Sequence, residues 1–187
     1  MDASIYISHF ELETERLRIR PLTQADEPLW CDLYTDAAIM HFIGPLLSRD
    51  RAKRSFRRAL ALAHDRGADR LFLVVTDKIA PHPLGVCGFS DLDPNRRQAE
   101  VGIILRSDAQ ARGVAQEALS ALTGHAFAIL PIDRLSARIA SGHAIAERVL
   151  IGIGFSQTGV QAAEAGFSRQ AIWSAFRHSW RHRSAIL

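Results

Sequence analysis

The segment from residue 99 to residue 130 constrains the fold of this chain most, because a strand-like run, a short turn and a long amphipathic helix follow one another there. Ala99 to Leu105 is rich in apolar and β-branched residues, as strands are. From Gly113 to Leu130 apolar residues recur with a period near 3.6, and Pro131 stops the pattern. The sequence therefore predicts a strand that delivers the start of a helix to the edge of a sheet.

The turn between them, Gln110-Ala111-Arg112-Gly113-Val114-Ala115, has the composition of an anion-binding site. A helix start leaves backbone N–H groups without partners and carries the positive end of the helix dipole. Gly113 and Ala115 lack bulk and let an anion approach the main chain, and Gln110 and Arg112 can add donors. Taken alone, the turn is explained equally well by a glycine that only eases the passage from strand to helix. The patterns G-x-G-x-x-G and G-K-[ST] do not occur, which excludes dinucleotide and P-loop sites.

The other periodic segments predict a mixed α/β layer structure. Turn residues separate three β-rich runs between residues 70 and 105, which we interpret as an antiparallel meander. Further strands are expected at 15–20, 134–139, 155–160 and 169–176. Besides the helix at 113–130, helices are expected to begin at Thr23 to Asp26, at Ser48 with its end at Gly67, and at His143 with its end at Gly154.

Composition favours one soluble globular domain over residues 1–187. The chain has 48% hydrophobic and 23% charged residues, and no segment of the sequence reaches the length of a membrane span. We therefore expect a cytoplasmic protein without a membrane partner. Cys31 and Cys87 lack metal-ligand spacing and the histidines form no metal pattern, so we expect reduced core cysteines, no disulfide framework and no metal site.

The basic residues are almost all arginines. Lys53 and Lys78 are the only lysines, so the other 21 of the 23 basic residues are arginines, and the formal net charge is +3. Arginine suits phosphate and carboxylate partners, although coding composition explains the bias as well. The segment from Arg177 to Arg183 is basic, and Trp180 within it is available to stack on a base. The hypothesis that the chain binds nucleic acid rests on this segment and otherwise has little support.

In its strand-turn-helix context, the Q-x-x-G-x-A turn resembles the coenzyme A pyrophosphate loop of the GNAT N-acetyltransferase superfamily. The resemblance covers nearly the whole chain. Residues 12–26, LETERLRIRPLTQAD, and 99–102, AEVG, are similar to the opening and the fourth strand of the branch that contains the ribosomal-protein alanine and serine N-terminal acetyltransferases. Near the other end, Arg148-Val149-Leu150 with Gly154-Phe155 is similar to the R-V-L-x-x-x-G-F helix ending, and residues 172–180 resemble the last strand.

The resemblance implies an α/β (α+β) fold, with a mixed, mostly antiparallel sheet of about seven strands flanked by about four helices. It also implies acetyl-CoA as co-substrate without a metal, and direct attack of a primary amine on the thioester. The amine would belong to a protein N-terminus or a small molecule, and the protein would be a monomer or homodimer. The cofactor residues implied are Gly102, Ile103, Leu105, the turn from Gln110 to Ala115, His143 and Arg148.

For the general base, Glu100 is the candidate implied by the resemblance, because it lies on the matched strand where substrate and thioester would meet. The sequence supports an alternative equally well, in which Glu100 is a surface glutamate paired with Arg96 or Arg97. Glu100 can act as the base only if it comes within hydrogen-bond or one-water reach of the amine. Asp91 is the second choice.

The chain departs from the family at the start of the fourth helix, where N-x-x-S is usual and His143 and Ala146 stand here. Ala146 cannot donate a proton to the leaving thiolate. His143 or Ser141 could substitute, or the thiolate could leave unaided. A non-catalytic module that binds coenzyme A is therefore the alternative to an active enzyme.

For the acyl acceptor, the resemblance points to the first two helices, their loop and the loop between the last strands. The residues there are mostly apolar, so ordinary packing under a loop explains them as well. The predicted acceptor residues are Tyr34, Phe42, Phe89, Asp91 and Phe167, with Met40 and Ile43 beside them.

Overall fold

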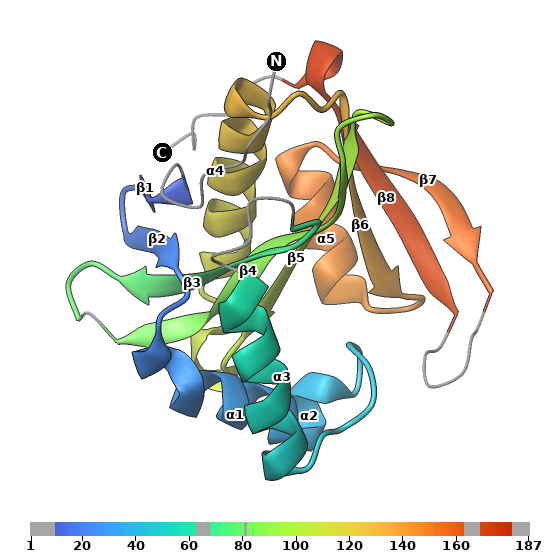
Figure 1. Ribbon diagram of the computed structural model, residues 1–187. Helices are drawn as coiled ribbons and strands as arrows, with labels where there is room; N and C mark the ends of the chain where they lie inside the picture. Colours follow the sequence, from blue (N-terminus) through green and yellow to red (C-terminus); the bar gives the residue numbers. More distant parts are fainter. Residues whose placement is uncertain (1–9, 63–67, 81, 163–168, 181–187) are drawn as a thin grey trace.

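A single eight-stranded sheet with helices on both faces forms the centre of the molecule (Figure 1). The structure is a computed structural model, and it describes residues 10–62, 68–80, 82–162 and 169–180. The strands are β1 (Leu12–Glu13), β2 (Leu17–Pro21), β3 (Leu71–Asp77), β4 (Pro83–Asp93), β5 (Gln98–Leu105), β6 (Arg134–Ala140), β7 (Ser156–Gln161) and β8 (Gln170–Phe176). The α-helices are α1 (Glu27–Thr35), α2 (Ala37–Met40), α3 (Arg49–Leu62), α4 (Val114–Ile129) and α5 (Ala144–Ile153).

The sheet runs in the order β1-β2-β3-β4-β5-β6-β8-β7. Every neighbouring pair is antiparallel except β5 and β6, which are parallel. The predicted mixed, mostly antiparallel fold and its central meander are thus confirmed. The two-residue β1 and the four-residue α2 are additional, because elements so short show no periodicity in a sequence.

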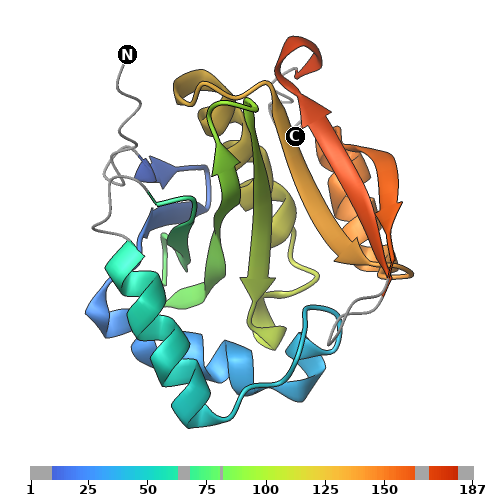
Figure 2. The same cartoon turned by 45° about the vertical axis from the view of Figure 1, so that its right-hand side comes forward.

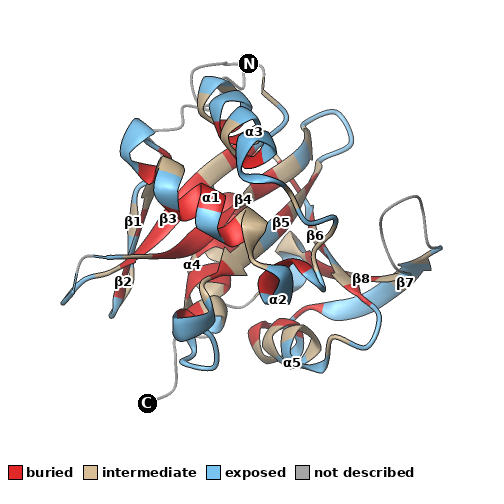
Figure 3. Cartoon of the chain, turned by 90° about the horizontal axis from the view of Figure 1, so that it is seen from below, coloured by how far each residue is buried: buried red, intermediate tan, exposed pale blue. Residues whose placement is uncertain are grey.

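Two hydrophobic cores lie on opposite faces of the sheet. Side chains alternate along a strand, so Leu73 and Val75 of β3 join the core under α4 and α5, whereas Val74 joins the core under α1 and α3. On the second face Phe56 of α3 packs against Trp30 of α1 with ring centroids 6.0 Å apart. Figure 3 shows that the buried residues follow the sheet and the sides of α1 and α4 that face it.

Short-range signals fix the helix ends. The Ser48 hydroxyl accepts a hydrogen bond from the Arg51 N–H at the start of α3, as its position predicts. Gly113 and His143 are the N-caps of α4 and α5. Gly154 ends α5 with a φ of 98°, a left-handed conformation that favours glycine. The predicted end of α3 at Gly67 lies outside the described residues.

Both cysteines are buried and free, as expected, and burial raises the pKa of the Cys87 thiol to about 12. Of the helices described, none has the length and apolar character needed to cross a membrane.

The entry into α1 is held by a buried carboxylate. Asp26 is 3% exposed, and both of its oxygens accept hydrogen bonds from the Arg20 guanidinium at 2.7 and 2.8 Å. The Thr23 N–H and hydroxyl also donate to Asp26 in a capping box. Burial raises the pKa of Asp26, but the hydrogen bonds from Arg20 and Thr23 outweigh it and leave the pKa below its ordinary value.

We expect Asp26→Ala to lower the free energy of unfolding by about 2 kcal/mol at neutral pH, because Arg20 and the helix entry lose their acceptor. A lowered pKa means that this stabilisation is present above the ordinary aspartate pKa and is lost as the pH falls through the lowered value. Urea unfolding of variant and wild type should therefore converge in acid. Asp32→Ala, which removes the exposed partner of Arg49, is the control and should change stability by less than about 0.5 kcal/mol.

Candidate active site

Strands β5 and β6 pair at one end and separate at the other. Their parallel pairing joins only residues Gln98–Glu100 to Arg134–Ser136. Beyond Glu100 the edge of β5 that faces β6 has no strand partner among the described residues, and Figure 2 shows the two strands diverging. The sheet is thus open along one backbone edge near its centre.

Alternation of the backbone decides which residues present hydrogen-bonding groups to this open edge. The Ala99 carbonyl accepts a hydrogen bond from Ser136 of β6, so Val101, Ile103 and Leu105 face the same side. The Leu105 carbonyl is occupied by the Gln110 amide at 3.2 Å, which leaves the backbone groups of Val101 and Ile103. Gly102, by contrast, turns its backbone toward β4.

Gly102 contributes space instead. A Cβ built on it would meet no atom within 4 Å, and the position is exposed. Of the three β5 residues predicted for the cofactor, Ile103 is therefore the one whose backbone lies free at the opening.

The turn that leads from β5 into α4 lies at the open end of this edge. Ala111 and Gly113 adopt left-handed conformations with φ of 57° and 76°. Gly113 has no capping side chain, and the first intrahelical bond runs from the Glu117 N–H to the Gly113 carbonyl at 3.0 Å. The three preceding helical N–H groups, from Val114 to Gln116, consequently point out of the helix start, as an anion site requires.

The side chains of this turn mainly brace its shape. The Gln110 amide ties the turn to the end of β5, and Arg112 donates weakly to the Asp108 carbonyl at 3.5 Å. Asp108 in turn pairs with Arg106 at 3.1 Å. The main-chain N–H groups are thus the donors that the turn leaves available, while Gln110 is already engaged.

A cluster of three charged side chains crosses the sheet where β5 and β6 begin to part. Arg138 of β6 contacts Glu100 of β5 through its Nε and Asp91 of β4 through its Nη2, the latter at 2.8 Å. Asp91 sits in an irregularity of β4 with a positive φ of 50°. The alternative pairing of Glu100 with Arg96 or Arg97 is wrong, because those arginines pair with Asp93 and Asp133.

Glu100 is the carboxylate of this cluster that is shielded from water, since its side chain is 18% exposed and that of Asp91 is 52% exposed. Burial raises the pKa of Glu100, and the charge and hydrogen bond of Arg138 offset part of that rise. Asp91 adds to the increase and Arg70 opposes it, with the net result that the pKa stays above its ordinary value. Such a carboxylate takes up a proton more readily than an exposed one.

His143 caps α5 and meets Phe42 from the loop after α2. The two rings lie 4.2 Å apart with an interplanar angle of 33°. The Nδ1 atom of His143 accepts from the Ala146 N–H at 3.4 Å, which leaves the proton of the neutral ring on Nε2. Burial lowers the pKa of His143, so the neutral form is favoured. A residue predicted for the acceptor and one predicted for the leaving group are thereby brought together.

The remaining predicted residues are spread more widely. Tyr34 stacks on Trp30 of α1 with centroids 4.7 Å apart, and burial raises its pKa to about 12. Phe89 packs edge-on against Phe10 in the core under α4 and α5, on the face away from α1 and α3, so it serves packing. Of the residues predicted near the acceptor, Met40 is buried, Ile43 packs on the core under α1 and α3, and Phe167 lies outside the described residues. Ser141 and Arg148, which were predicted for the leaving group and the cofactor, are exposed.

Two features of the charge distribution were not anticipated. Arg177 donates to the carbonyls of Phe127, Leu130 and Ile132 at the end of α4, so the first residue of the basic segment has a structural role.

Helix α3 carries six basic residues and one acidic residue in 14 positions. Within the described residues only Arg49 among these six forms an ion pair, whereas arginines elsewhere are mostly paired.

Comparison with known proteins identifies the fold. Residues 16–156 match the family described as the acetyltransferase (GNAT) domain. The chain belongs to the GNAT acetyltransferases. A curated relative of this GNAT protein, the uncharacterized N-acetyltransferase p20 of Bacillus licheniformis, is 26% identical over 153 residues, which are 80% of this chain and 84% of p20.

Solved GNAT structures have the same architecture. Spermidine N-acetyltransferase from Vibrio cholerae, in complex with CoA and spermine, superposes with a TM-score of 0.76 at 18% identity, over 89% of this chain and 99% of that one. RimL, a ribosomal L7/L12 alpha-N-protein acetyltransferase in complex with coenzyme A, gives 0.74 at 17% identity, over 87% and 95%. The ribosomal-protein-S5-alanine acetyltransferase of Vibrio fischeri gives 0.74 at 16% identity, over 91% and 98%.

Proposed function

We propose that this GNAT protein transfers an acetyl group from acetyl-CoA to a primary amine, by direct attack of the amine on the thioester. The observation that carries the proposal is the parting of β5 and β6 beyond Glu100, beside the uncapped start of α4. One edge thus offers backbone groups for an extended arm, and the helix start offers N–H groups for a pyrophosphate. The solved relatives from Vibrio cholerae and RimL, which hold coenzyme A, support this choice of co-substrate.

In the proposed reaction Glu100 takes a proton from the acceptor ammonium, directly or through one water. The free amine nitrogen then bonds to the acetyl carbon while the carbon–sulfur bond breaks, and the thiolate departs with the electron pair. The nitrogen gives its second proton to the thiolate, directly or through water, which leaves a neutral amide and a thiol. Backbone N–H groups of β5 would stabilise the developing oxyanion, as preorganised donors do. No covalent intermediate on the protein is required.

His143 is the group we assign to stabilise the departing thiolate. Its neutral ring carries a hydrogen on Nε2 that can donate a hydrogen bond to the departing sulfur, and it stands at the helix start where the family has its asparagine. Ser141, which is exposed two residues earlier, is the second choice. Because a thiolate leaves readily, the contribution of either group is expected to be smaller than that of Glu100.

The proposed acceptor is a protein N-terminus or a small-molecule amine. We assign two aromatic side chains to the acceptor site: Phe42, which is 41% exposed and contacts His143, and Tyr34 of α1. We place the carboxylate of Asp91 at the entrance to this acceptor site. The relatives act on both classes, since one acetylates spermidine and another a ribosomal protein.

An acceptor screen that follows release of free thiol from acetyl-CoA tests the proposal. The panel should contain peptides with free N-termini, polyamines and single amino acids, and calorimetry should measure acetyl-CoA binding in parallel. Thiol release with one acceptor class supports the proposal and names the substrate. Binding without release against the whole panel would favour the non-catalytic alternative, which the alanine at position 146 suggests.

The charged cluster around Arg138 leads to a prediction for the pH dependence of the rate. Arg138→Met should shift the acid limb of the pH-rate profile to higher pH, because removing the cation raises the pKa of Glu100 further. Wild type and variant should approach the same rate at high pH, where Glu100 is ionised in both. Arg97→Met, which breaks the exposed pair with Asp133, is the control and should leave the profile in place.

A further inference from the structure

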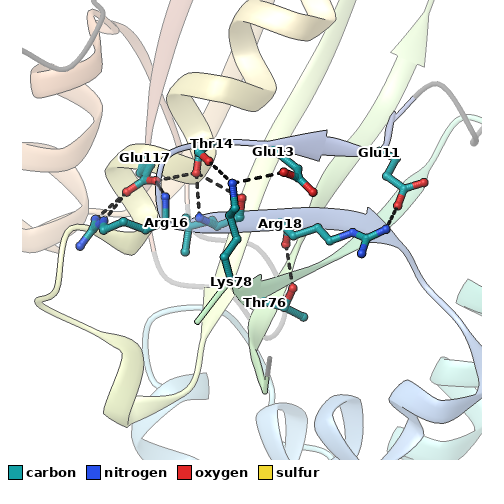
Figure 4. A network of polar contacts seen from close by, with 9 residues as sticks. Glu11, Glu13, Thr14, Arg16, Arg18, Thr76, Lys78 and Glu117 are labelled. Atoms are coloured by element: carbon teal, nitrogen blue, oxygen red, sulfur yellow. Dashed lines mark hydrogen bonds and ion pairs between the residues drawn. The ribbon is translucent and has the colours of Figure 1, made fainter. Parts of the chain in front are cut away.

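The hairpin of β1 and β2 is fastened to the first turn of α4 through one carboxylate (Figure 4). Glu117 of α4 accepts hydrogen bonds from the Thr14 hydroxyl and from the Arg16 N–H at 3.0 Å. The Arg16 guanidinium adds a third connection, with its Nε 2.7 Å and its Nη2 2.6 Å from Oε2 of the same carboxylate. Segments about a hundred residues apart in sequence thus meet at the start of this helix.

The same guanidinium reaches the anion-binding turn itself. Its Nη1 donates to the carbonyl of Arg112 at 3.1 Å. Its Nη2 lies 3.2 Å from the position that a Cβ on Gly113 would occupy. The Arg16 side chain is nevertheless half exposed, so it lies over the outer side of the turn and is not part of the core.

Glu117 would oppose anion binding if it stood alone. It lies in the first turn of α4, close to the N–H groups of Val114 to Gln116, and a carboxylate there repels a pyrophosphate. Partial burial raises the pKa of Glu117, but the hydrogen bonds from Thr14 and Arg16 outweigh it and keep the pKa below its ordinary value. The carboxylate is therefore charged at neutral pH and needs a compensating cation.

We propose that Arg16 is a positioning residue for coenzyme A, which cancels the charge of Glu117 so that the start of α4 can receive the pyrophosphate. This inference rests on the proposed function, because it concerns the same anion site. It assigns Arg16 no contact with the reacting atoms.

The hairpin itself supplies a matched comparison. Arg18 of β2 pairs with Glu11, and the two arginine side chains are almost equally exposed, at 50% and 51%. Figure 4 shows the Arg18 pair at the other end of the hairpin, away from α4. Arg18→Met therefore makes the same chemical change in the same hairpin without touching the turn.

The experiment measures the dissociation constant of coenzyme A by calorimetry for the wild type, Arg16→Met, Glu117→Gln, the double variant and Arg18→Met. We expect Arg16→Met to weaken binding about tenfold, and Arg18→Met to leave it unchanged. Since the double variant removes the uncompensated charge as well, it should recover to within about twofold of the wild type. Arg16→Lys, which keeps the charge, should lose less than Arg16→Met, and circular dichroism and thermal unfolding should verify that each variant folds.

The outcomes separate the inference from the function on which it rests. Unchanged affinity in Arg16→Met overturns the inference alone. A double variant as weak as Arg16→Met also overturns it, because a purely structural brace would not be rescued by removing its partner. If the wild type fails to bind coenzyme A, the proposed function falls and the inference falls with it.

Discussion

Gly113→Glu will abolish binding of coenzyme A while the chain remains folded. Gly113 has a φ of 76°, so any side chain there is strained by about 1–2 kcal/mol, and its Cβ would lie 3.2 Å from the Arg16 guanidinium. The added carboxylate would also occupy the space in front of the free N–H groups of α4 and repel the pyrophosphate. We expect the dissociation constant to rise by at least about a hundredfold, a change of about 3 kcal/mol.

Calorimetry measures this change, and Gly154→Glu is its control. Gly154 also has a left-handed conformation, with a φ of 98°, but it ends α5 and a Cβ there would meet only Trp180, at 3.9 Å. Both variants should lose similar stability in urea unfolding, while only the change at Gly113 should affect binding. Equal affinity in the two variants would remove the start of α4 from the proposed cofactor site.

Glu100→Gln is expected to reduce kcat/KM at neutral pH by about a hundredfold or more, which is the usual contribution of a general base. The pKa of Glu100 is raised by burial. The wild-type rate should therefore increase as the pH rises through a value above the ordinary glutamate range, because the base acts only when it is ionised. The glutamine variant should lack this acid limb.

Asp91→Asn is the matched control, since Asp91 contacts the same guanidinium of Arg138. It should keep the acid limb and move it to lower pH, because Asp91 helps to raise the pKa of Glu100. A pH-rate profile for Glu100→Gln that matches the wild type in shape would transfer the role of base to another group.

Local chemistry explains what could be predicted from the sequence. Ser48, Gly113 and Gly154 act within one helix turn of their own position, so their effects are visible in a short stretch of residues. The strand-turn-helix order around Gly113 likewise needed only hydrophobic periodicity. These signals located the turn at the start of α4 before any tertiary contact was known.

The partners of the charged residues could not be predicted in the same way. Glu100 meets Arg138 only because β5 pairs with β6, and Asp91 joins them because β4 is irregular there. The sequence neighbours Arg96 and Arg97 were plausible partners, but the turn directs them to Asp93 and Asp133.

Periodicity has a similar limit for the two faces of the sheet. It assigns Phe89 to one face of its strand but does not say which helices cover that face. The same limit applies to Arg16 and Glu117, whose contact depends on where the hairpin docks.

The uneven charge of α3 has a kinetic consequence. The helix has five more positive than negative charges, while the whole chain has a net charge of +3, so the remainder is net negative. Exposed cations gathered on one helix guide negatively charged molecules toward that side during diffusion. The association rate of a polyanion such as acetyl-CoA or an acidic peptide should therefore fall as added salt screens these charges. A polyamine, by contrast, would be repelled by the same charges.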